Sequence, residues 1–206
     1  MRLAIVGASG HGKVVAETAE LVGWKQLTFF DDAWPTLSSS FQWTVEGGTN
    51  ELLQRSHEFA SVVIAIGDNQ IRSEKQRELS SLGFSFASLV HPHATVSPSA
   101  HIGAGTVIFA RAIVNACADV GEGCIINTGA IVEHDCSVDS FTHISPNAVL
   151  AGGVRVGEGS WIGASASVKQ RISIGANSIV GMGAVVLRDV MDNSAVAGNP
   201  ARVIES

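Results

Sequence analysis

The sequence predicts a two-part chain, in which a small α/β domain with a Rossmann-like parallel sheet precedes an all-β parallel β-helix. The β-helix is predicted by a period of six: from Val96 to Val186, without insertion or deletion, every sixth residue is valine, isoleucine or leucine. That period matches neither an α-helix nor the alternation of a flat sheet. The α/β part is predicted because residues 1–88 lack the period and alternate strand-like with helix-like segments. We therefore place the two domains at residues 1–88 and 89–206.

The first part reads as strands that each end in a turn or loop, with helices between them. Strands are expected at residues 2–6, 26–30, 61–66 and 84–89, and helices at 14–22, 50–59 and 70–82. Residues 7–13 read as a glycine turn and residues 34–48 as a loop. This alternation indicates a parallel sheet, and its join to the β-helix is expected near His91 and Pro92.

In the second part, three hexads make one triangular coil, so residues 18 apart are expected to stack at about the 4.7–4.9 Å spacing of neighbouring strands. One coil cannot bury its own faces, so stability requires stacking. Two aliphatic columns are expected, one of Ile126, Ile144, Ile162 and Val180, and one of Val132, Leu150, Val168 and Val186. Glycines that follow the aliphatic residue are expected at corners that need a positive φ: Gly103, Gly121, Gly157, Gly163, Gly175 and Gly181. The run holds about five coils, and the tail after Val186 reads as a loop.

Three loops are expected to meet at the carboxyl edge of the predicted sheet, where open parallel sheets bind ligands. The first is GASGHGK, in which a strand, a glycine turn and a helix N-terminus form a cradle for an anion. Its glycine spacing differs from the dinucleotide fingerprint, which disfavours an NAD enzyme. Asp31 and Asp32 end the second strand, and Gly67 follows the third. Ordinary strand–helix turns would explain most of these residues, but a surface turn does not require His11.

A second group of polar residues changes the chemistry of the repeat without breaking its period. It comprises Asn127, the triplet Glu133-His134-Asp135 and His143. A histidine beside an acid suits a general base, because the acid holds the proton of one ring nitrogen and raises the basicity of the other. A solvated outer turn is the alternative interpretation of the triplet. His134 and His143 are half a coil apart, so they meet only if prisms pack around a threefold axis.

Charge and composition argue against some kinds of binding partner and indicate where the protein is located. The formal net charge of −6 argues against a nucleic-acid or membrane partner. No stretch is apolar for long enough to span a bilayer, and the first strand is too short for a signal peptide, so a cytoplasmic location is expected. Cys117, Cys124 and Cys136 occupy interior-type positions and are expected to be buried and reduced.

An ordered set of segments extends the interpretation to the whole chain: GASGHGK, the strand ending in FFDD, AIGDNQIR, HPHATVSPSAHIG, INTGAIVEHDC, SFTHISPNAVLAGGV and AGNPA. Together they resemble the bacterial nucleotide-sugar acetyltransferases of the hexapeptide-repeat class, of the sialic-acid-synthesis or bacillosamine type. AGNPA alone is weakly specific, whereas the ordered set is highly specific. The resemblance implies a left-handed β-helix, a homotrimer, a nucleotide sugar bound by the N-terminal domain, and acetyl-CoA between adjacent β-helices, with no metal.

The resemblance also implies roles for individual residues. His134 corresponds to the catalytic base, and Asp135 corresponds to the acid that hydrogen-bonds it, where the family often has glutamate. The residues implied to bind acetyl-CoA are His143, Gly152, Ala164 and Met182. The residues implied to bind the nucleotide sugar are Ser9, Gly10, His11, Asp31, Asp32, Gly67 and Asn127.

The implied activity is acetyl transfer from acetyl-CoA to the 4-amino group of a nucleotide-linked 4-amino-4,6-dideoxy sugar, with UDP favoured by the paired aspartates. Alternatives are O-acetylation of a sialic acid or another sugar, a GDP- or dTDP-linked amino sugar, and a non-catalytic nucleotide-sugar binder. A metal-dependent hydratase on the same β-helix would need three imidazoles per zinc. His101 lies about two coils from His134, too far for one metal.

Overall fold

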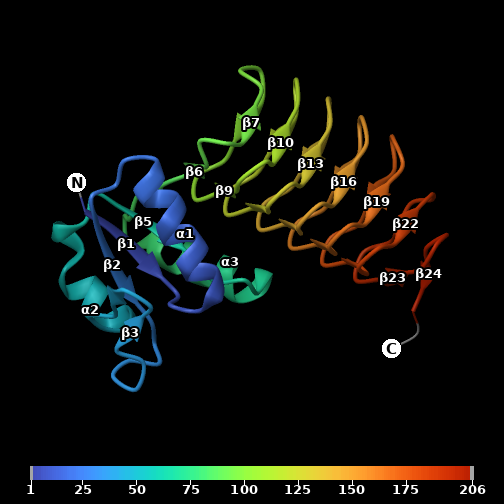
Figure 1. Ribbon diagram of the computed structural model, residues 1–206. Helices are drawn as coiled ribbons and strands as arrows, with labels where there is room; N and C mark the ends of the chain where they lie inside the picture. Colours follow the sequence, from blue (N-terminus) through green and yellow to red (C-terminus); the bar gives the residue numbers. More distant parts are fainter. Residues whose placement is uncertain (1, 205–206) are drawn as a thin grey trace. The chain divides into compact units, whose positions relative to one another are not determined.

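Strands and helices alternate along the first unit of the computed structural model, which describes residues 2–204. By its internal contacts the chain divides into Met1–His91 and Pro92–Ser206. The first unit holds a three-stranded sheet in the order β2-β1-β5 (Figure 1), formed by β1 (Arg2–Val6), β2 (Gln26–Phe30) and β5 (Ser61–Ile64). Both neighbours run parallel to β1. The parallel α/β sheet expected from the sequence is confirmed.

The helices of the first unit follow the predicted order. They are α1 (Gly10–Leu21), α2 (Thr49–Gln54), the 3-10 helix η1 (Ser56–Glu58) and α3 (Asn69–Ser81). α1 begins at Gly10 rather than at the predicted Val14, because the glycine turn itself winds into the first helical turn. Gly12 makes this close approach possible, since a Cβ atom there would lie 2.3 Å from the carbonyl oxygen of Gly7.

Two further segments of this unit differ from the prediction. The expected strand at residues 84–89 is reduced to a single parallel bridge between Phe86 and Val62, followed by β6 (Leu89–Val90). Phe86 packs against the core, but only the backbone on either side of it bonds to Val62. The expected loop at residues 34–48 contains an antiparallel hairpin of β3 (Ser39–Ser40) and β4 (Trp43–Thr44).

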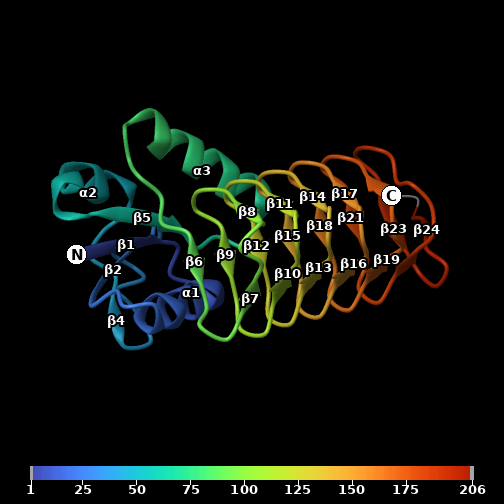
Figure 2. The same cartoon turned by 90° about the horizontal axis from the view of Figure 1, so that it is seen from above.

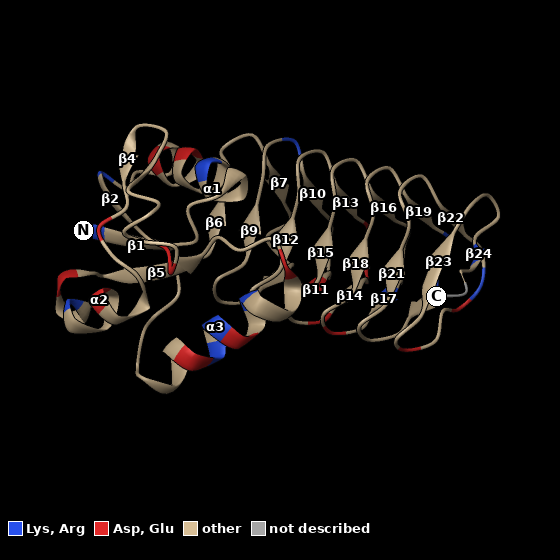
Figure 3. Ribbon diagram, turned by 90° about the horizontal axis from the view of Figure 1, so that it is seen from below, with Lys and Arg blue, Asp and Glu red and all other residues tan. Residues whose placement is uncertain are grey.

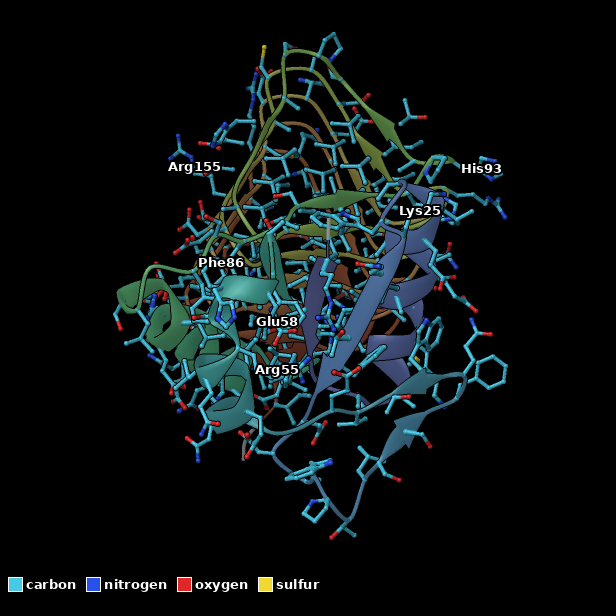
Figure 4. All side chains as sticks on the ribbon, turned by 90° about the vertical axis from the view of Figure 1, so that its left-hand side faces the viewer. Lys25, Arg55, Glu58, Phe86, His93 and Arg155 are labelled. Atoms are coloured by element: carbon cyan, nitrogen blue, oxygen red, sulfur yellow. The ribbon has the colours of Figure 1, made fainter. Side chains whose placement is uncertain are left out.

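The core of the first unit lies between the sheet and its helices. It contains Ala4, Val6, Phe30, Leu52, Val62, Ile64 and Leu79. Burying each larger aliphatic side chain contributes about 1.5–3 kcal/mol, which outweighs the weak surface ion pairs around it. Near the start of β1, Arg55 and Glu58 lie side by side, with Arg55 Nε 2.9 Å from Glu58 Oε1 (Figure 4). Acidic and basic residues also follow one another along α3 (Figure 3), as its part-exposed surface requires.

The second unit is a parallel β-helix whose coils stack in succession (Figure 2). Its first face consists of β7 (Thr95–Val96), β10 (Ile113–Val114), β13 (Ile131–Val132), β16 (Val149–Leu150), β19 (Ser167–Val168) and β22 (Val185–Val186). Its second face consists of β8 (His101–Ile102), β11 (Asp119–Val120), β14 (Ser137–Val138), β17 (Arg155–Val156) and β20 (Ser173–Ile174). Its third face consists of β9 (Val107–Ile108), β12 (Ile125–Ile126), β15 (His143–Ile144), β18 (Trp161–Ile162), β21 (Ile179–Val180), β23 (Ala195–Ala197) and the antiparallel β24 (Arg202–Val203).

Residues 18 apart pair across neighbouring coils, as the period predicts. Ile126 pairs with Ile144, Ile144 with Ile162, and Ile162 with Val180. The column that begins at Val132 forms in the same way. Both columns are buried, so the branched side chains fill the interior of the prism. The two aliphatic columns are therefore confirmed.

The corners of the β-helix differ from the prediction in which residue carries the positive φ. Left-handed φ values recur along the coils from Gly105 to Gly183, and none of the glycines predicted for that role is among them. Those glycines are needed for close approach instead. A Cβ atom on Gly103 would lie 2.4 Å from the backbone nitrogen of Glu122, in the next coil.

The tail and one cysteine also differ from expectation. The tail is not a loop throughout, because β23 and β24 add a further, shortened coil in which Val196 pairs with Val180, 16 residues away. Cys117 is exposed at one of the left-handed corner positions, contrary to expectation, whereas Cys124 and Cys136 are buried as expected. Within residues 2–204, no helix has the length and apolar character needed to cross a membrane.

Candidate active site

The carboxyl end of β1 leads into an open helix N-terminus. Gly7 has a φ of +105° and its N–H donates to the carbonyl oxygen of Phe30. Ser9 is the N-cap of α1, yet its side chain makes no capping hydrogen bond, and the first turn holds no acidic residue. Gly10 has no atom within 4 Å of the place where a Cβ would lie. The uncapped first turn and the positive end of the helix dipole suit this site for an anion.

Asp31 joins two of the expected loops. One carboxylate oxygen accepts from the backbone N–H of Ala8 at 2.8 Å, and the other accepts from Ala33 at 2.9 Å. The side chain therefore fixes the glycine turn to the segment that follows β2. This structural role was not predicted, and the expected contact of Asp31 with a nucleoside stays a prediction.

Asp32 is also held by the protein. Its carboxylate accepts from the N–H and the hydroxyl of Thr49, at 2.7 and 3.1 Å, and lies 3.5 Å from Nζ of Lys75. Thr49 is the first residue of α2, whose N-cap, Gly48, has no side chain to cap it. Burial alone would raise the pKa of Asp32, but the hydrogen bonds from Thr49 and the charge of Lys75 hold it below its ordinary value. Asp32 thus caps α2 from a distant position in the sequence.

We expect Asp32→Asn to lower the free energy of unfolding of the first unit by roughly 0.5–1 kcal/mol. This is at the low end of the usual contribution of a helix cap, because the carboxylate is mostly exposed. The depressed pKa means that the carboxylate contributes its stability above the ordinary value of 3.8, and loses it as the pH falls through the folded-state pKa. Urea unfolding at pH 7 and at pH 3 measures this. The difference between wild type and variant should shrink at pH 3, and a difference that grows there would contradict the assignment.

His11 and Gly67 lie at the same edge of the sheet. His11 is the second residue of α1, and Gly67 follows the end of β5. Burial first, and then the positive charge of Arg72, lower the pKa of His11 to about 4, so its ring is neutral at pH 7. The space beside Gly67 is open, with no atom within 4 Å of the place that a Cβ would occupy. The sequence did not single out Arg72, although it closes the AIGDNQIR segment.

His134 and Asp135 form a pair at the corner between the first and second faces, between β13 and β14. His134 Nδ1 lies 2.7 Å from Asp135 Oδ2. Asp135 occupies a left-handed corner position with a φ of 59°, a conformation that aspartate tolerates better than most residues. The carboxylate accepts the Nδ1 proton, which leaves the lone pair of Nε2 directed away from it. Their side chains are 62% and 67% exposed, so the basic nitrogen is accessible.

Gly152 lies in the next coil, directly against the imidazole. A Cβ atom at this position would be 2.6 Å from His134 Nε2. The neighbouring Gly153 N–H donates to the carbonyl oxygen of His134, which fixes the distance between the two coils. The Gly152 N–H donates no hydrogen bond within residues 2–204, so it is available to a ligand. The closeness of Gly152 to the base was not predicted, and the expected contact of Gly152 with acetyl-CoA stays a prediction.

Gly152→Ala should displace the ring of His134 and lower kcat roughly tenfold, because small displacements of a catalytic group from the reacting atoms are costly. The change is measured by steady-state kinetics. Gly157→Ala is the matched control, since a Cβ there would also crowd the next coil, 2.6 Å from the backbone nitrogen of Ala176, but at a corner away from His134. Equal losses in both variants would point to general damage to the β-helix.

His143 forms a second cluster, on the third face. Its Nε2 lies 3.0 Å from Nδ2 of Asn127. Asn127 Oδ1 already accepts the N–H of Thr128 at 2.8 Å, so the amide nitrogen faces His143 as a donor. His143 Nε2 must then accept, and the proton of the neutral ring sits on Nδ1. Trp161 stacks on the ring with an interplanar angle of 6°, and its indole N–H donates to Ser145.

The fold keeps the two clusters on different parts of the prism. His134, Asp135 and Gly152 share one corner, whereas Asn127 and His143 belong to the third face and the corner beside it. Ala164 and Met182 lie one above the other in that same corner, where the Gly183 N–H bonds to the Ala164 carbonyl and Met182 is 79% exposed. Among residues 2–204, no three His, Cys, Asp or Glu side chains are arranged to hold a metal.

Comparison with known proteins places this architecture in a family. The N-terminal domain of PglD matches residues 2–79, and the bacterial transferase hexapeptide of six repeats matches residues 153–188. The acetyltransferase domain of PglB from Neisseria gonorrhoeae, solved in complex with acetyl coenzyme A, is 44% identical with a TM-score of 0.94, over 98% of both chains. The chain belongs to the PglD-type family of hexapeptide-repeat acetyltransferases. The resemblance inferred from the sequence is confirmed.

Two further members of this family are informative. A mutant of perosamine N-acetyltransferase from Caulobacter crescentus, in complex with CoA and GDP-perosamine, is 37% identical with a TM-score of 0.95, covering 100% of this chain and 98% of that one. UDP-N-acetylbacillosamine N-acetyltransferase from Bacillus subtilis is 43% identical over 110 residues. That match spans 52% of this chain and about half (51%) of the Bacillus protein.

Proposed function

We propose that this protein transfers the acetyl group of acetyl-CoA to the 4-amino group of a nucleotide-linked 4-amino-4,6-dideoxy sugar, with UDP as the nucleotide. The single observation that carries the proposal is the His134–Asp135 pair, in which the imidazole side chain is mostly exposed and its Nδ1 is held by a carboxylate at 2.7 Å. Relatives named for N-acetylation of bacillosamine and perosamine derivatives favour an amino group over a hydroxyl. The Bacillus relative is named for a UDP sugar, which supports UDP here.

Each step of the transfer has a residue suited to it. The sugar amine attacks the thioester carbonyl carbon, and His134 Nε2 takes the proton that the nitrogen loses. Asp135 stabilises the imidazolium that forms. The free N–H of Gly152 lies beside the base and suits a hydrogen bond to the developing oxyanion. The oxyanion then re-forms the carbonyl as the carbon–sulfur bond breaks. CoA leaves as the thiolate and receives a proton, so the chemistry needs neither a covalent intermediate nor a redox step.

The clusters at His134 and at His143 are brought together, in this proposal, by a homotrimer. One chain supplies His134 and Gly152 at its corner, and a neighbouring chain supplies its third face with His143 and Asn127. This arrangement suits the topology, because a single chain holds the two clusters on different faces. His143 would contact the carbonyl or sulfur region of the thioester. Ala164 and Met182 would flank the pantetheine arm.

The nucleotide sugar is assigned to the sheet edge of the first unit. The open N-terminus of α1 at Ser9 and Gly10 suits its phosphates. The neutral ring of His11 can accept or donate one hydrogen bond there. Asp31 and Asp32 are assigned to contacts with the nucleoside, although both carboxylates also have partners within the protein. Gly67 is assigned to a close approach of the backbone to the ligand.

A panel of UDP-, GDP- and dTDP-linked 4-amino sugars, incubated with acetyl-CoA and followed by release of free thiol, tests the proposal. The UDP-linked amino sugar should give the highest kcat/KM, and a sialic acid should give none. Mass spectrometry of the product separates an amide from an ester. A GDP-linked sugar as the best substrate would correct the nucleotide, and thiol release with sialic acid alone would overturn N-acetylation.

A further inference from the structure

Arg72 is a buried charge at the edge of the first sheet. It lies in the first turn of α3, and only 1% of its surface is exposed. Its guanidinium donates to the carbonyl oxygens of Ile66 and Gly67, at 3.0 and 3.1 Å, and to Oδ1 of Asn69 at 2.7 Å. Ile66 and Gly67 belong to the segment that connects β5 to α3, and Asn69 is the first residue of α3. One interior side chain therefore holds that whole segment.

The hydrogen bonds to Arg72 decide where the N–H groups of the segment point. In a trans peptide the N–H is directed opposite to the carbonyl oxygen of the same unit. Because the carbonyl oxygens of Ile66 and Gly67 face the interior guanidinium, the N–H groups of Gly67 and Asp68 face away from it. Neither N–H donates a hydrogen bond within residues 2–204. The protein thus presents two adjacent unused donors beside the open space at Gly67.

We propose that Arg72 is a positioning residue for the nucleotide sugar, acting through the Gly67 and Asp68 N–H groups that it turns toward the ligand. This inference rests on the proposed function and adds to it a residue that does not itself touch the substrate. The two N–H groups bind an oxygen acceptor of the nucleotide sugar. A neutral carbonyl oxygen suits them better than a phosphate, because the Asp68 carboxylate is close by, where it caps α3 by accepting from Ile71.

Arginine is required for this task by its geometry. Its planar fork reaches the two carbonyl oxygens through one terminal nitrogen and Asn69 through the other. A lysine ammonium is a single point and cannot span the same three acceptors. The charge of Arg72 also acts on His11, which lies in the first turn of α1. Both consequences concern the nucleotide-sugar end of the reaction and leave the His134 pair unaffected.

Steady-state kinetics with the UDP-linked 4-amino-4,6-dideoxyhexose tests the role of Arg72. Arg72→Lys and Arg72→Met should raise the KM for the nucleotide sugar roughly tenfold, as the loss of two oriented donors predicts. The kcat and the KM for acetyl-CoA should not change. Asn69→Ala, which removes one acceptor and leaves the charge in place, should raise the same KM less. Arg77→Met, an exposed arginine on the same helix, is the matched control.

Isothermal calorimetry with UDP alone separates this inference from the proposed function. Wild type that neither binds UDP nor acetylates the amino sugar would refute the proposed function. Wild type that does both, with the nucleotide-sugar KM unchanged in Arg72→Lys and Asn69→Ala, would refute the positioning role. A fall in kcat together with a rise in the KM for acetyl-CoA would also refute it, because that pattern indicates general structural damage. Circular dichroism checks that each variant is folded. If Arg72→Met is unfolded, the KM values of Asn69→Ala and Arg72→Lys decide whether Arg72 has the positioning role.

Discussion

His134→Ala should lower kcat/KM by about 10²–10⁴, the usual contribution of a general base. The amine must lose a proton as it attacks, and His134 Nε2 is the acceptor that the corner geometry leaves open. Because the side chain is mostly exposed, its removal should leave the fold and the binding of both substrates intact. Thiol release under saturating and limiting sugar measures kcat and KM separately.

Two comparisons make that result specific. His101→Ala changes an exposed histidine of the same β-helix, on β8, and should leave kcat/KM unchanged. Asp135→Asn keeps a residue that tolerates the left-handed φ but removes the charge that stabilises the imidazolium, so its activity should lie between those of wild type and His134→Ala. Turnover of His134→Ala close to that of wild type would remove His134 from the mechanism.

The period of six made the β-helix predictable, because burial repeats with every strand and Ile126, Ile144 and Ile162 all meet the same interior environment. The corner glycines were misread for a physical reason. What excludes a side chain at Gly103 is the backbone at Glu122 in the next coil, a contact that local sequence does not reveal. The left-handed residue lies two positions later, where glycine, asparagine, aspartate, cysteine and arginine all occur.

The candidate site was predictable where the chemistry stood out from its background. His134 and Asp135 stand where most other hexads carry small or uncharged polar residues, and the structure places them in contact. Arg72 was missed because the buried residues of α3 include Arg72, Ser73 and Gln76, so no apolar period marks the interior face. Asp31 and Asp32 were read as ligand contacts, yet their bonds to Ala8 and Thr49 depend on loops distant in the sequence.

Co-expression of His134→Ala with His143→Ala should restore activity that neither variant has alone. In a trimer whose sites lie between chains, each seam takes His134 from one chain and His143 from the next. One seam in four then combines two intact residues, so random assembly should recover about a quarter of wild-type activity. The observation behind this is topological: the corner after β13 and the strand β15 lie on different faces of one chain.

The alternative arrangement, a site completed within one chain, predicts a different pair of results. Co-expression of the two single variants would then restore nothing, since every chain carries one defect. Mixing wild type with the double variant sharpens the distinction, because a site within one chain retains about half of the wild-type activity and a site between chains about a quarter. Two different tags, quantified in the assembled protein, establish that both chains are present in equal amounts. Half-activity in that experiment, with no rescue in the first, would place both histidines in a single chain and refute the shared seam.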